Sequence, residues 1–130
     1  MNAGNEQIEM EQPGDASERM SFCNQKEAIM IARIWRGRTV AAQADKYLDY
    51  LQETGVKGAR TTPGNRGVRI LRRITGQEAE FLFVSFWDSL DAIQAFAGPD
   101  IERAVYFPED TAFLLELEPT VAHYEVFNYE

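Results

Sequence analysis

The chain has 130 residues, a formal net charge of -8 and a pI near 4.7, and 45% of its residues are hydrophobic. This length suits one domain, and the apolar content is enough to build a core. The acidic balance argues against a nucleic-acid partner, because phosphate recognition needs clustered Lys and Arg. Apolar stretches stay shorter than the roughly 20 residues that span a bilayer. Cys23 is the single cysteine and has no internal disulfide partner, so we expect a cytoplasmic protein without membrane partners.

Residues 1–27 are polar and acidic and show no sustained period, which predicts a flexible tail ahead of one domain over residues 28–130. The domain begins with the segment AIMIARIWRG at residues 28–37. Its β-branched and aromatic residues favour a first strand that ends at Gly37.

A helix is predicted next, with Thr39 as its cap and apolar residues at helical spacing as far as Leu51. Gly55 is typical of the left-handed residue that ends such a helix. Residues 61–67 are rich in turn formers, and the alternating segment VRILRRI at 68–74 predicts the second strand.

The segment EFLFVSFW at 80–87 is rich in aromatic residues and predicts the third strand. A short loop at 75–78 favours a hairpin between strands two and three. Ser89 can cap the helix LDAIQAFA at 90–97, which Gly98 and Pro99 end.

Two short helices are predicted at 101–107 and 109–118, and the segment VAHYEVF at 121–127 predicts a fourth strand. The resulting order, β-α-β-β-α-β, is that of an α+β ferredoxin-like fold with an antiparallel sheet and helices on one face. Trp, Phe and Val on the other face would be poorly accommodated by water. We therefore expect a homodimer in which two sheets pair.

Several segments carry a resemblance to a known family: GARTTPGNRGVRILRR, the S-x-W-[DE]-S run at Ser85–Ser89, the AFAG-x-D-I-x-x-A run at Ala95–Ala104 and the closing HYEV. The chain resembles the antibiotic biosynthesis monooxygenase superfamily over roughly Ile29 to Phe127. The resemblance implies a dimeric α/β barrel.

The resemblance implies an enzyme that oxidises a polycyclic phenol with dioxygen and without a cofactor, or a non-catalytic small-molecule-binding or stress-associated dimer. Haem binding or degradation is a third, weaker implication. The positions at which the haem-degrading branch has a functional Trp and His fall on Phe96 and Tyr106, which favours quinone formation over haem degradation. The sequence also lacks HExxH, CxxC and GxGxxG, so no metal or dinucleotide site is expected.

Three residues are candidates for catalysis: Arg33, His123 and Tyr106. Arg33 interrupts an apolar strand, where it needs a carboxylate such as Glu125, a substrate anion or solvent. His123 is the only histidine and serves either proton transfer or the architecture of its strand. Tyr106 is placed to donate a hydrogen bond to developing negative charge.

Three aromatic residues are candidates for binding an aromatic substrate: Trp35, Trp87 and Phe96. An indole ring can stack on the substrate while its N–H holds an oxygen. Packing in the core is the alternative role for each of them.

Overall fold

The computed structural model describes residues 28–129, so the predicted tail over residues 1–27 and Cys23 lie outside the described residues. Four antiparallel strands form one sheet in the order β3-β4-β2-β5. They are β2 (Met30–Val40), β3 (Asn65–Thr75), β4 (Glu78–Trp87) and β5 (Ala122–Val126). This sheet, with its helices, confirms the α+β ferredoxin-like prediction.

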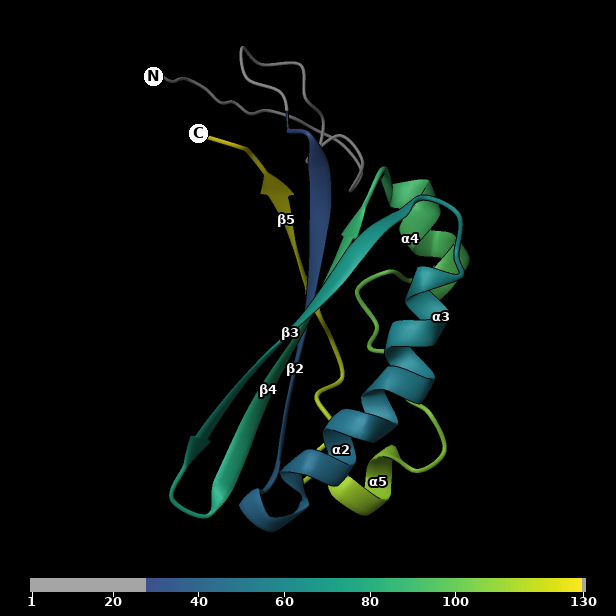
Figure 1. The fold of residues 1–130 in the computed structure, drawn as a ribbon. Coiled ribbons are helices and arrows are strands. Elements are labelled where there is room, and N and C mark those ends of the chain that lie inside the picture. The colour runs from purple at the N-terminus through teal and green to yellow at the C-terminus, as the bar shows by residue number, and fades with distance from the viewer. Residues whose placement is uncertain (1–27, 130) are drawn as a thin grey trace.

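The helices lie on one side of the sheet (Figure 1). The first helical region runs from η1 (Ala41–Gln43) through α2 (Ala44–Leu51) and the π-helical turn η2 (Gln52–Val56) to α3 (Lys57–Arg60). It is followed by α4 (Leu90–Ala97) and α5 (Asp110–Phe113). In the described part of the chain, every helix is too short or too polar to span a membrane.

The turn chemistry predicted for the hairpin is present. Thr75 pairs with Glu78, so that only Gly76 and Gln77 connect β3 to β4, and Gly76 has a φ of 61°. A positive φ is what a two-residue hairpin turn requires. Ser89 also caps α4 as predicted, because its side chain accepts a hydrogen bond from the backbone N–H of Ala92.

Three predicted boundaries in the first half are wrong. Gly37 does not end the first strand but lies inside β2, and a Cβ there would come within 2.2 Å of the Trp35 ring. Thr39 is a buried residue of β2, not a helix cap. Gly55 does not end the helix, which continues to Arg60. A Cβ on Gly55 would lie 3.0 Å from Phe83, so this glycine lets the helix pack close to the sheet.

The second half contains less helix than predicted. Residues 101–107 form turns and an isolated bridge between Arg103 and Thr120, not a helix. Of the helix predicted at 109–118, only Asp110–Phe113 is helical. These segments instead form an irregular connection that runs beside the sheet on its helical side (Figure 1).

The core lies between the sheet and the helices. Alternate residues of β4 are buried on this side, and the helices contribute Tyr47, Leu51 and Ile93. The strand residues of this core include Ile31, Trp35, Phe81, Phe83 and Trp87.

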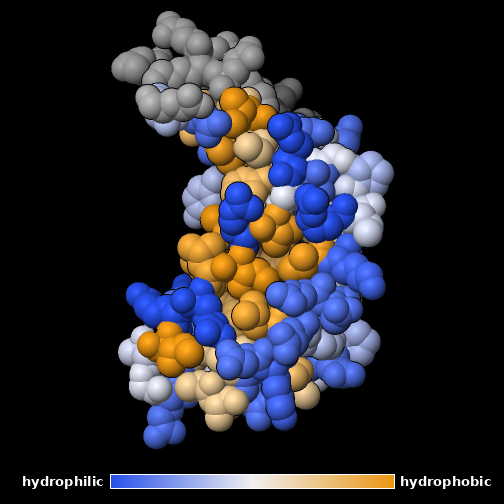
Figure 2. Space-filling model, in the orientation of Figure 1, coloured by the Kyte–Doolittle hydropathy of each residue, from blue (hydrophilic) through white to orange (hydrophobic). Residues whose placement is uncertain are grey.

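The other face of the sheet has no helix over it. Its residues include Ile34, Leu82, Val84 and Phe86, which are only partly buried, and Leu71 and Tyr124, which are 50% and 55% exposed. Figure 2 shows apolar side chains gathered along the middle of the molecule, with hydrophilic side chains on either side. The sequence predicted an apolar face here and was wrong only about tryptophan, since Trp35 and Trp87 lie in the core on the helical side.

Candidate functional site

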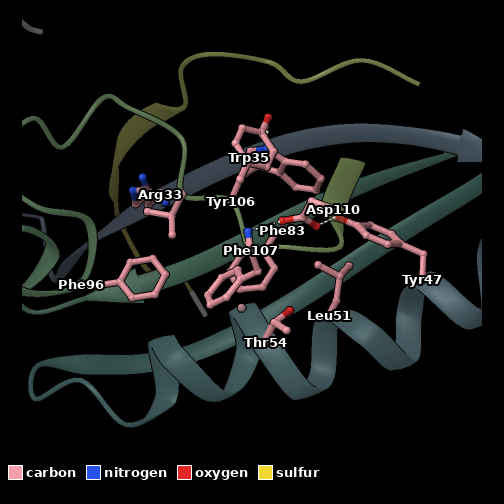
Figure 3. A pocket seen from close by; sticks show the side chains of 12 residues that line it. Arg33, Trp35, Tyr47, Leu51, Thr54, Phe83, Phe96, Tyr106, Phe107 and Asp110 are labelled. Atoms are coloured by element: carbon pink, nitrogen blue, oxygen red, sulfur yellow. Dashed lines mark hydrogen bonds between the residues drawn. The ribbon is translucent and has the colours of Figure 1, made fainter. Parts of the chain in front are cut away.

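A narrow cleft lies between the sheet and the first helical region, and residues 105–107 and Asp110 complete its lining (Figure 3). Half of its twelve lining residues are aromatic: Trp35, Tyr47, Phe83, Phe96, Tyr106 and Phe107. The cavity has a volume of only about 30 Å³, which is room for little more than one water molecule. A flat ring system therefore requires these side chains to move apart.

One end of the cleft carries a buried acid. Asp110 is 4% exposed, and its Oδ1 accepts a hydrogen bond of 2.9 Å from the hydroxyl of Tyr47. Its Oδ2 accepts a second hydrogen bond of 2.6 Å from the backbone N–H of Phe107. Burial and the neighbouring Asp110 charge raise the pKa of Tyr47 well above its ordinary value. Tyr47 is thus held as a neutral donor to the carboxylate.

The sequence did not single out this acid. Asp110 falls in a segment that predicts the first turn of a helix, where an acidic residue is ordinary. Tyr47 fits the apolar stripe of the first helix and carries no separate signal. Only packing α5 against α2 brings the two side chains together.

Trp35 and Tyr106 meet along the cleft wall. The indole N–H of Trp35 donates to the Tyr106 hydroxyl at 3.1 Å, and the two rings meet edge to face with centroids 6.1 Å apart. The Tyr106 hydroxyl donates in turn to the backbone carbonyl of Glu118 at 2.5 Å. Burial raises the pKa of Tyr106. The donor groups of Trp35 and Tyr106, which were predicted to face a substrate, are therefore already engaged with the protein.

Arg33 lies at the other end of the cleft, beside Phe96 (Figure 3). It is 3% exposed, and its guanidinium carbon lies 5.6 Å from the centre of the Phe96 ring. Its Nη2 donates to the backbone carbonyls of Arg103 at 2.8 Å and Ile101 at 3.4 Å. Burial lowers the pKa of Arg33 to about 10, so it remains charged at neutral pH.

The ion pair considered between Arg33 and Glu125 does not form. Glu125 stands opposite Ile31 in the register of β2 and β5, and no carboxylate in the described part of the chain lies within ion-pair distance of Arg33. The cross-strand neighbour of Arg33 is His123.

His123 lies outside the cleft lining, on the edge strand β5. Burial, with a further contribution from the Arg33 charge, lowers its pKa to about 4, so the imidazole is neutral at pH 7. Its Nε2 is buried without a hydrogen-bond partner. Within residues 28–129, no three His, Cys, Asp or Glu side chains come together as metal ligands.

The structure separates the remaining two candidates. Phe96 lines the cleft, whereas Trp87 is fully buried behind it, with the two ring centroids 5.5 Å apart. The indole N–H of Trp87 donates to Ser85 Oγ at 2.8 Å. The cleft thus brings together Arg33, Trp35, Phe96 and Tyr106 of the predicted set and leaves out Trp87 and His123.

Comparison with known proteins places the chain in a family context. The family model of antibiotic biosynthesis monooxygenases matches residues 30–104. Among curated proteins, none matches the chain.

Two solved structures illustrate the similarity of fold. A Bacillus cereus protein, provisionally assigned as an antibiotic biosynthesis monooxygenase, is 13% identical with a TM-score of 0.56, covering 78% of this chain and 95% of its own. MhuD of Mycobacterium tuberculosis, a haem degrader with two haems in its active site, is 25% identical with a TM-score of 0.48, covering 77% and 98%. The first similarity supports the fold.

Proposed function

The chain belongs to the antibiotic biosynthesis monooxygenase family, whose model covers residues 30–104, and from this membership we propose that it oxidises a phenolic aromatic compound with dioxygen. The observation that carries the proposal is an aromatic cleft with a carboxylate, Asp110, at one end and a guanidinium, Arg33, at the other. Aromatic walls with a few placed polar groups are typical of small-molecule sites.

The reaction needs dioxygen as its co-reactant. With 1-naphthol as an example, the phenol and one dioxygen give 1,4-naphthoquinone and one water. The phenolate supplies the electrons: one passes to dioxygen, and the resulting radicals combine into a carbon–oxygen bond. The O–O bond then breaks as the ring carbon loses its proton, and the second oxygen leaves as water. The protein binds, deprotonates and excludes solvent.

Asp110 is the group we assign to deprotonation. Its Oδ1 and Oδ2 are fixed by Tyr47 and by the Phe107 N–H, and a carboxylate oxygen has lone pairs left for a phenol hydroxyl. Arg33 stabilises the anionic form electrostatically, while Trp35, Phe83 and Phe96 contact the rings. Tyr106 positions Trp35 through their hydrogen bond.

A second function follows from the width of the cleft. Trp35, Phe96 and Tyr106 leave room for little more than one water molecule. This observation favours a protein that binds a small molecule, or serves as a structural dimer, without transforming it. The two functions differ in turnover and not in fold.

Turnover of 1-naphthol decides between them. We expect the purified chain to consume dioxygen and form quinone, and we expect Asp110→Asn to lower kcat by about 10²–10⁴-fold, the usual contribution of a general base. Asp88→Asn is the matched control, because Asp88 is a surface carboxylate paired with Arg66. Binding without oxygen consumption would support the second function, and unchanged kcat in Asp110→Asn would remove Asp110 from the reaction.

We also propose that a second copy of the chain covers the exposed apolar face of the sheet. Monomers rarely leave a group of apolar side chains such as Ile34, Leu82, Val84 and Phe86 uncovered in water. Leu82→Lys, in the middle of this face, is expected to shift sedimentation from dimer to monomer. Gln94→Lys is the control, since Gln94 is exposed on α4, on the helical side of the sheet. A monomeric wild-type chain would refute the pairing.

A further inference from the structure

Arg33 differs from the other arginines in the described part of the chain. Five of them pair with carboxylates near the surface: Arg36, Arg38, Arg66, Arg72 and Arg73. Arg60, Arg69 and Arg103 are exposed to water. Arg33 alone is both buried and without a carboxylate, and desolvation is the one cause that perturbs its pKa. A buried cation without a counter-charge is costly.

The hydrogen bonds that Arg33 makes leave much of its donor capacity unused. Both carbonyl contacts involve Nη2, and Nε is buried without a partner. Across the β2–β5 ladder, His123 Nε2 is also buried without a partner. Unpartnered buried nitrogens are rare in folded proteins, and the Arg33 Nε–H is a donor that lacks an acceptor.

We propose that the Arg33 end of the cleft binds a carboxylate carried by the substrate, which makes the substrate an aromatic hydroxy acid. This inference rests on the proposed function. A guanidinium donates charge-assisted hydrogen bonds to a carboxylate, and Nε and Nη1 are the donor nitrogens of Arg33 that make no bond to the two backbone carbonyls. The hydroxyl then points to Asp110 at the opposite end, with the rings between Phe83, Phe96 and Phe107 (Figure 3).

A structural role for Arg33 makes a different prediction. If the guanidinium serves only to hold the carbonyls of Ile101 and Arg103, the charge of a ligand has no influence on binding. The two roles are separated by a pair of ligands of the same shape, 6-hydroxy-2-naphthoate and 6-hydroxy-2-naphthamide. Both carry the hydroxyl at the end remote from the second group, as the cleft requires.

The first experiment measures the dissociation constants of both compounds for the wild-type protein by calorimetry. We expect the carboxylate to bind at least tenfold more tightly than the amide, because charge-assisted hydrogen bonds are the stronger kind. Arg33→Gln is expected to abolish this preference. Arg36→Gln, on the same strand but paired with Glu80 at the surface, is expected to retain it. Equal binding of acid and amide by the wild-type chain overturns the proposal without requiring any variant to fold.

His123 provides an independent readout, because it is the only histidine and gives one imidazole signal by NMR. Bound carboxylate offsets the Arg33 charge, so the pKa of His123 is expected to rise from about 4. The amide is expected to leave it unchanged. An unchanged pKa of His123 at saturating 6-hydroxy-2-naphthoate also contradicts the proposal.

The outcomes separate this inference from the proposed function. If the acid is preferred over the amide but 1-naphthol is not oxidised, the carboxylate site stands and the monooxygenase function fails. If the acid and the amide bind equally and 1-naphthol is oxidised, the function stands and the carboxylate site fails. If neither naphthalene compound binds, the carboxylate site fails, and turnover of 1-naphthol alone decides the function.

Discussion

Removing the hydroxyl of Tyr47 tests whether Asp110 is held as the structure shows. Tyr47 is 1% exposed and donates to a carboxylate that is 4% exposed. Tyr47→Phe keeps the ring contacts with Phe81 and Phe113, at centroid distances of 5.2 and 5.3 Å. The substitution therefore isolates one hydrogen bond to a buried acceptor.

The magnitude follows from the burial of both partners. A hydrogen bond to a charged group contributes about 1.5–3 kcal/mol, and the loss is largest when the remaining partner stays buried. We expect Tyr47→Phe to lower the free energy of unfolding by about 2 kcal/mol. With an m-value of roughly 1–2 kcal/mol/M, the urea midpoint falls by about 1–2 M.

Tyr50→Phe is the matched control on the same helix. The Tyr50 hydroxyl accepts a hydrogen bond from the exposed N–H of Glu109 at 2.8 Å, and water can replace it. Its expected cost is below about 0.5 kcal/mol. Equal losses for the two variants in urea unfolding followed by circular dichroism would refute the reasoning, because Tyr47 would then contribute no more than a surface hydroxyl.

Three further predictions concern other parts of the fold. The pKa of His123 is about 4 in the folded chain and about 6.5 when unfolded, so the unfolded chain takes up the proton first and stability is lost as pH falls through this window. Allowing for the partial exposure of the ring, we expect the free energy of unfolding to fall by about 1 kcal/mol between pH 7 and 5. In urea titrations, His123→Gln should show a weaker dependence of stability on pH. The same pH dependence in both proteins would contradict the effect of burial on His123. Gly64 has a φ of 93°, and a Cβ there would lie 2.5 Å from the Ala92 Cβ. Gly64→Ala should therefore lower the thermal unfolding midpoint more than Gly76→Ala, because no atom lies within 4 Å of a Cβ at Gly76. Equal midpoints for the two variants would show that α4 moves aside freely. Hemin titration should give no Soret band that saturates at a defined ratio, because the only histidine lies outside the narrow cleft; a saturating band would support haem binding.

The sheet and α4 were predictable because their signals are local. The alternation of apolar residues predicts β4 from a few neighbouring positions, and the Ser89 cap predicts the start of α4 in the same way. Gly55 illustrates what local signals miss. Glycine is typical of a helix end, but here it is needed because Phe83 of the sheet lies against the helix. The role of Gly55 depends on its contact with Phe83, which is 28 positions away in the sequence, so a local pattern cannot predict it.

The irregular connection was mispredicted for a related reason. Residues 101–107 have helix-compatible composition, but their backbone groups bond elsewhere: the N–H of Ala104 donates to Pro119, and the carbonyls of Ile101 and Arg103 accept from Arg33. Tertiary partners replaced the i→i−4 bonds of a helix. The hydrogen bonds from these carbonyls to the buried guanidinium outweighed the weak intrinsic preference for helix.

The two ends of the cleft show why only one of two site residues could be predicted from the sequence. Arg33 stands out in the sequence because its neighbours along the strand are apolar. Asp110 does not, because an acidic residue is ordinary in the first turn of a helix. Its burial becomes evident only in the structure, where α5 places it in the interior. The closed cleft adds a requirement of its own, since a ligand must supply the energy that separates Phe96 and Tyr106 from the sheet. Stacking on the aromatic walls contributes part of this energy for any flat ring. A ligand that also satisfies Arg33 and Asp110 gains at both ends, so under the two proposals above the closed state selects hydroxy acids over plain aromatic hydrocarbons.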